Sequence, residues 1–484
     1  MRRHRLLAVL LSTVVLTLVG AAPARAQDSE VVGLLKDLIR INTSNPPGNE
    51  ALVAELLRAR LAPLGFEVEI VPTPADGKAH LIARLPATAP SGEKPLLLAG
   101  HEDVVGVERP LWTVDPFAAV IRGDRLYGRG ALDFKGGLAA FTVAAMRLAR
   151  EGAPRARDLI LLAEADEEGG AYGTAWLAEN HWAKIDASES INEGGWIFAD
   201  RSGGARLMGI TTIDKNSLSV TFSTRSTSTH SSRPLRDSAL RRLVRALDRV
   251  EQYDAAPRVT PTARTYLRAW ARGASAKTAR RLRALTTTRR PAVRRRLADR
   301  LRDGRWGELF DGLVRNIFVP TIVTGGFRAN VLPGTAQATV NMRMLPGQKP
   351  RPLLRELRRA VADPRVQITP IVTGDATVEE TLDTFDERAA QAPSATDTDL
   401  YRTLVREGRR QWPGVEVTPA LFEAGTDATP WRQRGIPVYG VYPYPITNAD
   451  LMAMHGNDER VPIAGLEQGT DMLTRVLQDA LSGP

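Results

Sequence analysis

The sequence predicts an α/β fold into which a second, α+β domain is inserted. Strand-like and helix-like segments alternate through residues 27–208 and return in residues 374–484. In the first of these regions, the continuous apolar run at 159–163 is typical of a strand that is covered on both faces. Between the two regions, residues 218–222 and 336–344 alternate apolar with polar side chains, as half-exposed antiparallel strands do.

The α/β domain, formed by residues 27–208 and 374–484, is predicted to begin with helices. Helical spacing covers residues 29–64, apart from a turn around Pro46 and Pro47. The elements expected next are a strand at 66–71, short apolar runs at 81–85 and 95–99, and an Ala- and Leu-rich helix from Gly137 to about Arg150. After the inserted domain, the segments 400–411, 438–441 and 466–481 restore the α/β pattern.

The inserted domain is predicted to span residues 209–373. Its expected strands are 218–222, 317–323, 336–344 and 366–372, and its expected helices are 238–250 and 352–362. The resulting order, β-α-β-β-α-β, is typical of a ferredoxin-like sandwich. Residues 374–396 are polar and turn-rich, so we expect a connection there that leads back to the α/β domain.

Residues 1–26 have the three parts of a secretory signal peptide. Three arginines precede an apolar run at 6–19, and the small-residue pattern Ala-Arg-Ala follows at 24–26. The apolar run is shorter than the roughly 20 residues of a spanning helix, which favours cleavage over an uncleaved anchor. We therefore expect an exported protein, periplasmic or secreted, with no stable membrane span after cleavage.

The formal charge of +10 is concentrated in arginines between residues 264 and 305. Apolar residues among these arginines have the spacing of amphipathic helices, so we expect a helical insertion at about 255–317. Clustered arginines attract the phosphates of lipids and nucleic acids. No aromatic stacking platform accompanies the charge, which favours a solvated outer face, and no nucleic-acid partner is expected.

Five potential metal ligands each stand at the end of an apolar run or in a Gly-marked turn. The chain has no cysteine, which excludes a thiolate zinc site. Ligands drawn from separate strand ends and loops are typical of hydrolases that activate water, so the pattern predicts a buried dinuclear metal site. The five residues are His101, Asp133, Glu168, Glu193 and His455.

Three consecutive acids, 166–168, follow the apolar run at 159–163. Their mutual repulsion is costly unless a cation compensates it, although a surface acidic turn is the alternative. If one of these carboxylates binds a metal, its neighbour is free to accept a proton from a polarised water. Asp103, two residues after His101, is a candidate to hold the second imidazole nitrogen.

The order of the motifs resembles one known family. His-x-Asp at 101–103, Gly-Arg-Gly-Ala-x-Asp-x-Lys at 128–135, Asp-Glu-Glu at 166–168, Glu-Gly-Gly at 193–195 and His-Gly-x-x-Glu-Arg-Val at 455–461 are similar to the co-catalytic zinc metallopeptidases. These include aminoacylase, carnosinase, glutamate carboxypeptidase and succinyl-diaminopimelate desuccinylase. The resemblance covers about 31–477 and is greatest to the branch of vacuolar Gly-Xaa carboxypeptidase and secreted N-acyl-amino-acid hydrolases.

The resemblance implies a zinc-peptidase catalytic domain with a mixed sheet and flanking helices, and a ferredoxin-like lid and dimerisation domain. It implies two zinc ions per subunit and a homodimer. Asp133 would bridge the ions, His101 and Glu193 would complete the ligands of one, and Glu168 and His455 those of the other.

The resemblance also implies roles for six further positions and for Asp103. Glu167 would be the general base, and Asp103 the partner of His101. His230 would stabilise the oxyanion, often from across a dimer. Asn330 and Arg343 would hold the carboxylate of the substrate, and Gly425 and Thr426 would form the turn beside it.

We therefore expect a dizinc hydrolase that cleaves an amide bond next to a free amino-acid carboxylate, as a carboxypeptidase or dipeptidase acting on small peptides. An N-acyl-amino-acid deacylase of the aminoacylase type is the alternative within the same chemistry. An exported basic protein that binds a polyanion or a membrane and carries a vestigial metal site is the alternative of another class.

Overall fold

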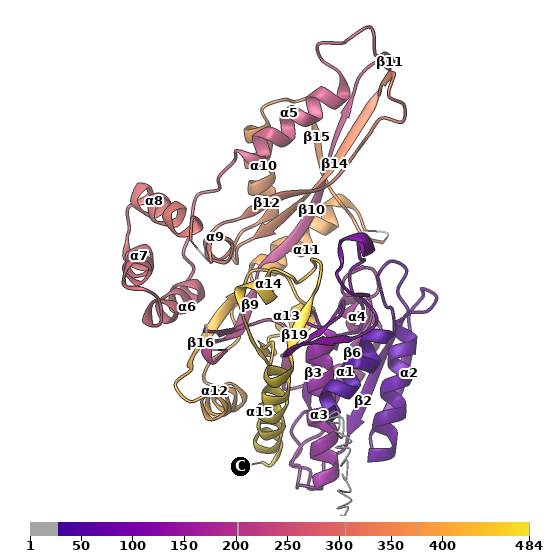
Figure 1. The fold of residues 1–484 in the computed structure, drawn as a ribbon, viewed down its shortest axis with the longest axis vertical. Helices are drawn as coiled ribbons and strands as arrows, with labels where there is room; N and C mark the ends of the chain where they lie inside the picture. The colour runs from indigo at the N-terminus through magenta and orange to yellow at the C-terminus, as the bar shows by residue number, and fades with distance from the viewer. Residues whose placement is uncertain (1–27, 201–202, 305, 375, 484) are drawn as a thin grey trace, which may run out of the picture.

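The computed structural model describes residues 28–200, 203–304, 306–374 and 376–483 (Figure 1). Two sheets, one of ten strands and one of four, organise this part of the chain into two bodies. The expected signal peptide lies outside the described residues. Among the residues that the structure does describe, no helix is long and apolar enough to cross a membrane.

The ten-stranded sheet is mixed, as expected. Its central strands β6, β3, β7 and β17 run parallel to one another, and β1 and β2 pair in antiparallel fashion with their neighbours. Strand β9 is antiparallel to β17 and β8 but parallel to β16. In spatial order the strands are β1 (Glu67–Pro72), β2 (Ala79–Leu85), β6 (Leu159–Glu164), β3 (Leu96–His101), β7 (Glu189–Asn192), β17 (Val438–Gly440), β9 (Ala205–Asp214), β8 (Ile197–Ala199) and β18 (Pro445–Ile446), with β16 (Glu416–Phe422) paired to β9.

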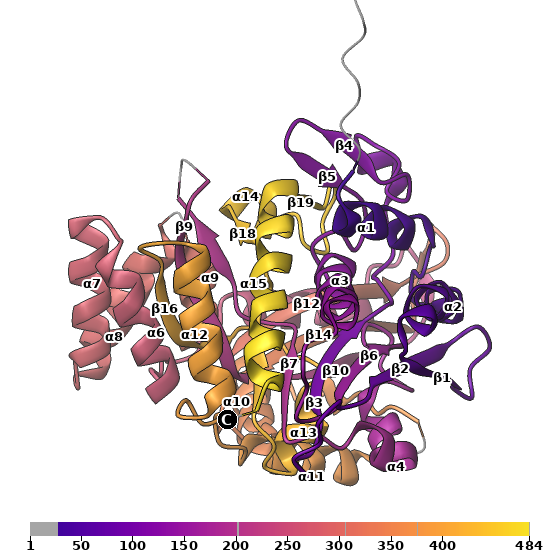
Figure 2. The same ribbon diagram turned by 90° about the horizontal axis from the view of Figure 1, so that it is seen from below.

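Both faces of this sheet are covered, which confirms the interpretation of the apolar run at 159–163. Leu159 and Leu161 belong to the core under α1 (Glu30–Arg40), α2 (Glu50–Leu61), α3 (Lys135–Glu151) and α15 (Ile463–Leu481). Ile160 and Leu162 belong to the core under α4 (Thr174–Ile185) and α13 (Thr429–Gln433). Figure 2 shows α3 and α15 side by side on the first face.

The four-stranded sheet has the predicted ferredoxin-like order. Its elements along the chain are β10 (Asn216–Arg225), α5 (Ala239–Glu251), β12 (Ile317–Gly325), β14 (Thr335–Met344), α10 (Pro350–Val361) and β15 (Gln367–Pro370). In space the strands lie in the order β12-β14-β10-β15, and all pairs are antiparallel. This unit forms the lid, which lies above the large sheet in Figure 1.

Two features of the lid differ from the sequence-based expectation. Residue 209 lies inside β9, a strand of the large sheet, so the chain passes to the lid sheet only at Lys215, between β9 and β10. The prediction of a turn-rich connection at 374–396 is wrong, because residues 378–389 form helix α11 (Val378–Ala389). Leu382 and Phe385 of α11 are buried in the lid core.

The Arg-rich region forms the expected helices, α6 (Pro261–Arg272), α7 (Ala276–Thr287), α8 (Pro291–Arg302) and α9 (Gly307–Val314). Helix α6 packs against β16 and β9 of the large sheet, α7 packs against α6 and α8, and α8 packs against α9. Trp270 of α6 is buried, and its ring lies 4.8 Å from that of Phe198 and 5.3 Å from that of Phe310. The helices α7 and α8 lie at the outer side of the molecule (Figure 1).

A small third sheet joins distant parts of the chain near the edge of the large sheet. It consists of β4 (Val120–Arg122), β5 (Arg125–Tyr127) and β19 (Arg460–Pro462). Because β19 pairs with β5, the loop before Arg460 lies beside the loop after Tyr127. Further helices are α12 (Asp399–Gln411) and α14 (Asn448–Leu451).

Candidate metal centre

The five expected ligands converge at the carboxyl ends of the parallel strands. His101 is the last residue of β3, Glu168 follows β6, and Glu193 follows β7. The pairing of β5 with β19 brings the loops of Asp133 and His455 to the same edge. Ligand sites of open α/β sheets form at this edge, since the loops there are free to shape a site while the strands hold them in place.

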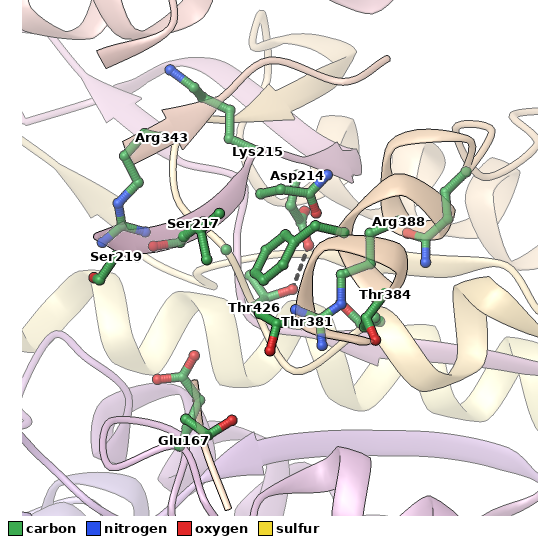
Figure 3. Close-up of a pocket in the computed structure, with 18 of the residues that line it drawn as sticks. Glu167, Asp214, Lys215, Ser217, Ser219, Arg343, Thr381, Thr384, Arg388 and Thr426 are labelled. Carbon is green, nitrogen blue, oxygen red and sulfur yellow. Dashed lines mark hydrogen bonds between the residues drawn. The ribbon is translucent and has the colours of Figure 1, made fainter. Parts of the chain in front are cut away.

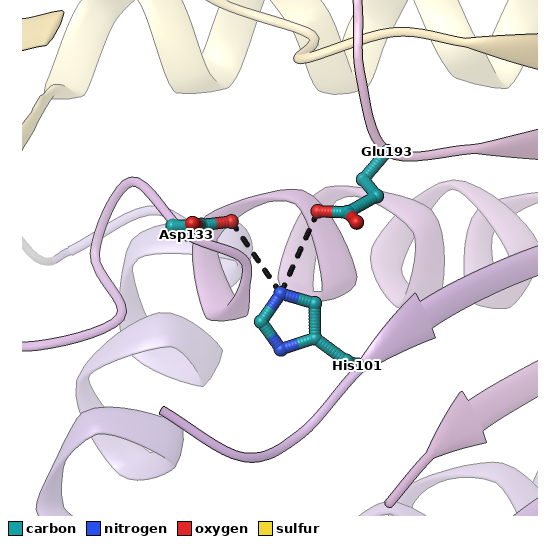
Figure 4. A group of neighbouring side chains, drawn as sticks. All are labelled: His101, Asp133 and Glu193. Carbon is teal, nitrogen blue, oxygen red and sulfur yellow. Dashed lines mark hydrogen bonds and ion pairs between the residues drawn. The ribbon is translucent and has the colours of Figure 1, made fainter. Parts of the chain in front are cut away.

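The first group of ligands consists of His101, Asp133 and Glu193. The Nε2 atom of His101 lies 3.4 Å from Asp133 Oδ1 and 3.5 Å from Glu193 Oε2 (Figure 4). All three residues are buried. Burial lowers the pKa of His101, but the carboxylates of Asp103, Asp133 and Glu193 outweigh it and raise the pKa well above its usual value. The group therefore favours a positive charge at Nε2.

The second group consists of Asp133, Glu168 and His455. The Nε2 atom of His455 lies 3.0 Å from Asp133 Oδ2 and 2.8 Å from Glu168 Oε1. The side chain of His455 is 45% exposed, so this end of the expected buried site is open. Partial burial lowers the pKa of His455, but its hydrogen bonds to the two carboxylates raise it to about 11. Asp133 thus presents Oδ1 to one imidazole and Oδ2 to the other, which is the arrangement of a bridging carboxylate.

The donor set of these two groups fits a pair of divalent cations. Within each group the candidate ligand atoms lie within 4.8 Å of one another. Imidazole nitrogens and carboxylate oxygens, without a thiolate, are the ligands of many catalytic zinc sites. Three buried or nearly buried carboxylates against two imidazoles leave excess negative charge, which bound cations compensate.

Asp103 contacts His101 in a different way from the one expected. The Nδ1 atom of His101 lies 2.9 Å from the backbone oxygen of Asp103, whereas the carboxylate is 3.6 Å away. The carboxylate instead accepts hydrogen bonds from the backbone N–H groups of Glu167 (3.1 Å) and Glu168 (3.0 Å) and from Asn45 Nδ2 (2.7 Å). Asp103 therefore orients the imidazole mainly through its backbone and fixes the acidic turn through its side chain.

Glu167 lies beside both ligand groups. One of its oxygens lies within 4.8 Å of candidate ligand atoms of His101 and Glu168. Burial is the main cause that raises the pKa of Glu167 well above its usual value, and the charges of Glu193 and Glu168 add to it. A carboxylate in such surroundings is suited to carry a proton during a reaction.

Two residues to which the sequence analysis assigned no role hold the candidate ligands in place. The hydroxyl of Tyr442 donates a hydrogen bond to Asp133 Oδ1 (2.6 Å) and lies 3.1 Å from Glu193 Oε2. The carboxylate of Glu459, fully buried, accepts hydrogen bonds from the backbone N–H groups of Leu132 (2.8 Å) and Asp133 (3.0 Å). Glu459 stands within the His-Gly-x-x-Glu-Arg-Val motif, which was the available signal, but no pattern marked Tyr442.

A cavity of about 590 Å³ opens beside the metal groups, between the large sheet and the lid (Figure 3). Its volume lies in the range of small-molecule sites. Glu167 and Glu168 line it from the large sheet, and Arg343 lines it from β14 of the lid. Gly425 and Thr426, which follow β16 of the large sheet, also line the cavity, so it brings together three of the four expected substrate-binding residues.

His230 and Asn330 do not lie beside the metal groups. His230 belongs to the short strand β11 (Thr229–His230), which pairs with β13 (Val331–Leu332) at the far tip of the lid (Figure 1). Both residues are exposed, and the backbone N–H of Ser231 donates to the backbone oxygen of Asn330 at 2.8 Å. Within a single chain, the structure therefore does not bring these two residues to the metal groups.

The two ligand groups, the large mixed sheet and the inserted lid define a metallopeptidase with two domains. Residues 97–479 match the description "Peptidase family M20/M25/M40", and the chain belongs to this family.

Individual proteins with related names are similar to this chain over most of its length. The chain is 27% identical over 396 residues to the probable carboxypeptidase S-like 2 of Dictyostelium discoideum, covering 80% of this chain and 72% of the relative. It is 26% identical over 477 residues to the N-fatty-acyl-amino acid synthase/hydrolase PM20D1 of Mus musculus, covering 95% and 90%.

A solved structure has the same fold. The M20 family metallo-carboxypeptidase Sso-CP2 of Sulfolobus solfataricus superposes with a TM-score of 0.68 at 18% identity, covering 93% of this chain and 99% of that one. At this identity the likeness shows the fold, in which the mixed sheet and the lid were both expected from the sequence.

Proposed function

We propose that this protein is a dizinc hydrolase that cleaves an amide bond next to a free amino-acid carboxylate, as a carboxypeptidase or dipeptidase. The observation that carries the proposal is the position of Asp133, whose two carboxylate oxygens face His101 and His455 at 3.4 and 3.0 Å. The cavity beside this centre supports a small substrate, because it offers the Arg343 guanidinium within reach of Glu167 and Glu168.

The chain supplies the groups that position the substrate and move the proton. Two bound zinc ions would supply Lewis-acid polarisation of the amide and activation of a water. Arg343 binds the carboxylate of the substrate and so places the neighbouring amide beside the metal groups. Glu167 takes a proton from the attacking water and later delivers it to the leaving amine, so the reaction consumes one water and releases an amino acid.

A substitution at Glu167 tests this mechanism directly. We expect Glu167→Gln to lower kcat by about 10²- to 10⁴-fold, because the amide cannot accept the proton. The variant keeps all five ligands, so elemental analysis is expected to find two zinc ions per chain in both proteins. Near-normal turnover in the variant would remove Glu167 from the mechanism, and loss of zinc would instead assign it to the metal site.

The second candidate is an N-acyl-amino-acid deacylase. The similarity to the mouse N-fatty-acyl-amino acid synthase/hydrolase over 95% of this chain favours it. Both activities place a free carboxylate next to the amide that is cleaved. A panel of dipeptides, acetyl-amino acids and long-chain acyl-amino acids, assayed with added zinc, separates them by the ratio of kcat/KM values.

The lid supports a homodimer. Its outer strand β12 pairs with β14 on one side only and is one of the two edges of the four-stranded sheet. Val319, Ile322 and Val323 of β12 are 45%, 57% and 58% exposed. Apolar side chains on an open sheet edge favour pairing with another strand, and the β12 strand of a second copy would extend the sheet. In such a dimer the lid tip, with His230 and Asn330, would serve the centre of the partner.

We also propose that the protein is exported. The motif of basic, apolar and small residues at 1–26 supports this location. The full chain produced in a bacterial host with two membranes is expected to yield a mature protein that begins near Gln27 in the periplasm or the medium. N-terminal sequencing of the fractionated protein checks this outcome, and an intact Met1 in the cytoplasmic fraction would contradict it.

A further inference from the structure

Arg388 extends from α11 into the cavity beside the metal groups (Figure 3). Among the described residues, its guanidinium has no ion pair and no hydrogen bond, and its Nε atom is enclosed without a partner. The guanidinium lies over the ring of Phe385, 5.0 Å from its centroid. An arginine keeps its charge in such surroundings, so an unpaired guanidinium stands at a binding cavity.

Beside Arg388 stands one further hydrogen-bond donor without an acceptor, whereas the hydroxyls of Thr381 and Thr384 donate to the backbone oxygens of Thr377 and Glu380. Gln391, one turn along the chain, also lines the cavity, and its Nε2 atom is buried without a partner. The hydroxyl residues Thr381 and Thr384 lie on the same face of α11 (Figure 3). Asp427 is the acid whose charge acts on Arg388, but the two groups form no ion pair. Two enclosed donors without acceptors fit a ligand that supplies acceptor oxygens.

The other cationic groups of the cavity fall into two kinds. Lys215 donates to the backbone oxygens of Gly312 (2.9 Å) and Arg315 (2.7 Å), and Arg432 forms an ion pair with Asp214. Both basic side chains therefore have partners within the protein.

Arg343, on β14, resembles Arg388 in that its guanidinium has no ion pair or hydrogen bond among the described residues. The cavity thus holds two guanidinium groups without partners, on different elements of the lid (Figure 3). Figure 3 shows Arg343 and Arg388 on opposite sides of the view, so we expect one substrate carboxylate to reach only one of them.

We propose that Arg388 is a specificity residue that binds a second carboxylate of the substrate, so that the preferred substrates carry two carboxylates. This inference rests on the proposed amide hydrolysis, in which Arg343 holds the carboxylate next to the cleaved bond. The second carboxylate belongs either to the side chain of the released amino acid or to the acyl group. Both sources present the same chemistry to Arg388, and the substrates used in the test separate them.

The test compares matched substrates with the zinc-loaded, full-length protein. N-acetyl-glutamate and N-acetyl-glutamine differ only in the charge of the side chain, and N-succinyl-alanine and N-succinamoyl-alanine differ only in the charge of the acyl group. We expect one charged substrate to have a kcat/KM about 10- to 100-fold above its neutral match, the effect of a charge-assisted hydrogen bond. The pair that shows the preference identifies the source of the second carboxylate.

The variant Arg388→Gln is expected to remove this preference, mainly through KM, because the contact is remote from the reacting amide. Arg388→Lys is expected to retain part of it. Arg355→Gln is the matched control, since Arg355 is an exposed arginine of α10 in the same lid and does not line the cavity. Melting temperatures of the three variants establish that each is folded. Calorimetric binding of N-acetyl-glutamate and of N-succinyl-alanine to the zinc-loaded Glu167→Gln protein, with and without Arg388→Gln, gives a readout independent of turnover.

Three outcomes are distinguishable. A preference for one dianionic substrate that Arg388→Gln abolishes supports the inference. Turnover of neutral and charged substrates at equal kcat/KM, or equal losses on all four in Arg388→Gln, overturns it and leaves the proposed hydrolase intact. The absence of turnover of any acyl-amino acid or dipeptide by the zinc-loaded wild type refutes the proposed function itself.

Discussion

Tyr442 shows how one side chain orients the candidate metal centre. Its hydroxyl donates to Asp133 and lies 3.1 Å from Glu193, so it contacts the candidate ligand shared by both groups and a candidate ligand of the first group. We expect Tyr442→Phe to weaken zinc binding by about 10- to 100-fold, as the loss of a residue that orients metal ligands commonly does. Competition with a chromophoric chelator measures the affinity.

The matched control is Tyr127→Phe. Tyr127 lies on β5 near the same loops, and its hydroxyl makes no hydrogen bond within the described part of the chain. Equal zinc affinity in the Tyr442→Phe protein and the wild type would show that Asp133 and Glu193 hold their positions without the hydroxyl.

Lys215 predicts a pH dependence of stability. Burial lowers the pKa of its ammonium to about 7, against about 10.4 in an unfolded chain. Between these two values the unfolded state binds more protons than the folded state, so the contribution of Lys215 to the free energy of unfolding rises with pH and is lost as the pH falls toward 7. The neutral amine still has two N–H groups for the oxygens of Gly312 and Arg315.

We therefore expect the melting temperature of the wild type, minus that of Lys215→Met, to increase from pH 6.5 to pH 10. Lys349→Met provides the control, because that lysine is 60% exposed. A difference that stays constant across this range would show that Lys215 titrates normally in the folded protein.

Single residues also show how far the sequence could predict the site. His101, Asp133 and Glu193 were identified because each stands at the end of an apolar run or in a Gly-marked turn, and both features can be recognised in the sequence. Tyr442 acts through a hydroxyl that contacts two distant carboxylates, and such a contact leaves no local pattern. Asp103 was expected to use its carboxylate on His101, but the choice between carbonyl and carboxylate depends on loop geometry that spacing does not determine.

At the scale of the element, helix α11 carries the largest difference from the sequence-based expectation. Residues 374–396 are polar enough to be interpreted as a connection, yet Thr377 and Glu380 form a capping box at the start of a helix. The Thr-x-x-Glu signal was present in the sequence. The polar composition of the segment outweighed this signal, because Leu382 and Phe385 are the large apolar residues of the helix that are buried.

The capping box gives a prediction for this element. Thr377→Ala is expected to reduce the stability of α11 by about 1 kcal/mol, since the N–H of Glu380 loses its acceptor. Hydrogen exchange measured by mass spectrometry is expected to show about fivefold faster exchange in peptides of residues 378–389. Thr265→Ala in α6 is the control, and unchanged exchange in α11 would show that packing alone holds this helix.

At the scale of the whole molecule, the separation of His230 from the metal groups leads to a test of the dimer. If the lid tip serves the partner, Glu167→Gln and His230→Ala chains have complementary defects. After subunit exchange, half of the dimers are mixed, and each mixed dimer contains one complete site. We expect about one quarter of wild-type activity from two nearly inactive proteins.

The control mixes Glu167→Gln with Glu168→Ala chains, whose defects lie in the same part of the site and cannot complement one another. Recovery in that mixture, or no recovery in the first, would place His230 outside the partner's active site. Analytical ultracentrifugation of the wild type shows independently whether the chain is dimeric.

The order of the two bodies was predictable because strand alternation changes from buried runs to half-exposed runs at their boundary. The side of the large sheet to which the Arg-rich helices attach could not be predicted from the sequence. Their apolar residues show that they bury one face, but Trp270 finds its partners on Phe198 and Phe310, which only the tertiary structure brings together.

Because α11 packs in the lid core, the groups proposed to bind the substrate and the candidate metal ligands lie on different bodies of the molecule. Arg343 and Arg388 both belong to the lid, whereas all five candidate metal ligands belong to the large sheet or to loops around it. The candidate metal site is therefore formed without any residue of the lid, and we expect cation binding to be independent of the position of the lid. If Arg343 and Arg388 bind the substrate as proposed, a bound substrate would contact both bodies, and its length would have to match the distance between the lid arginines and the metal groups.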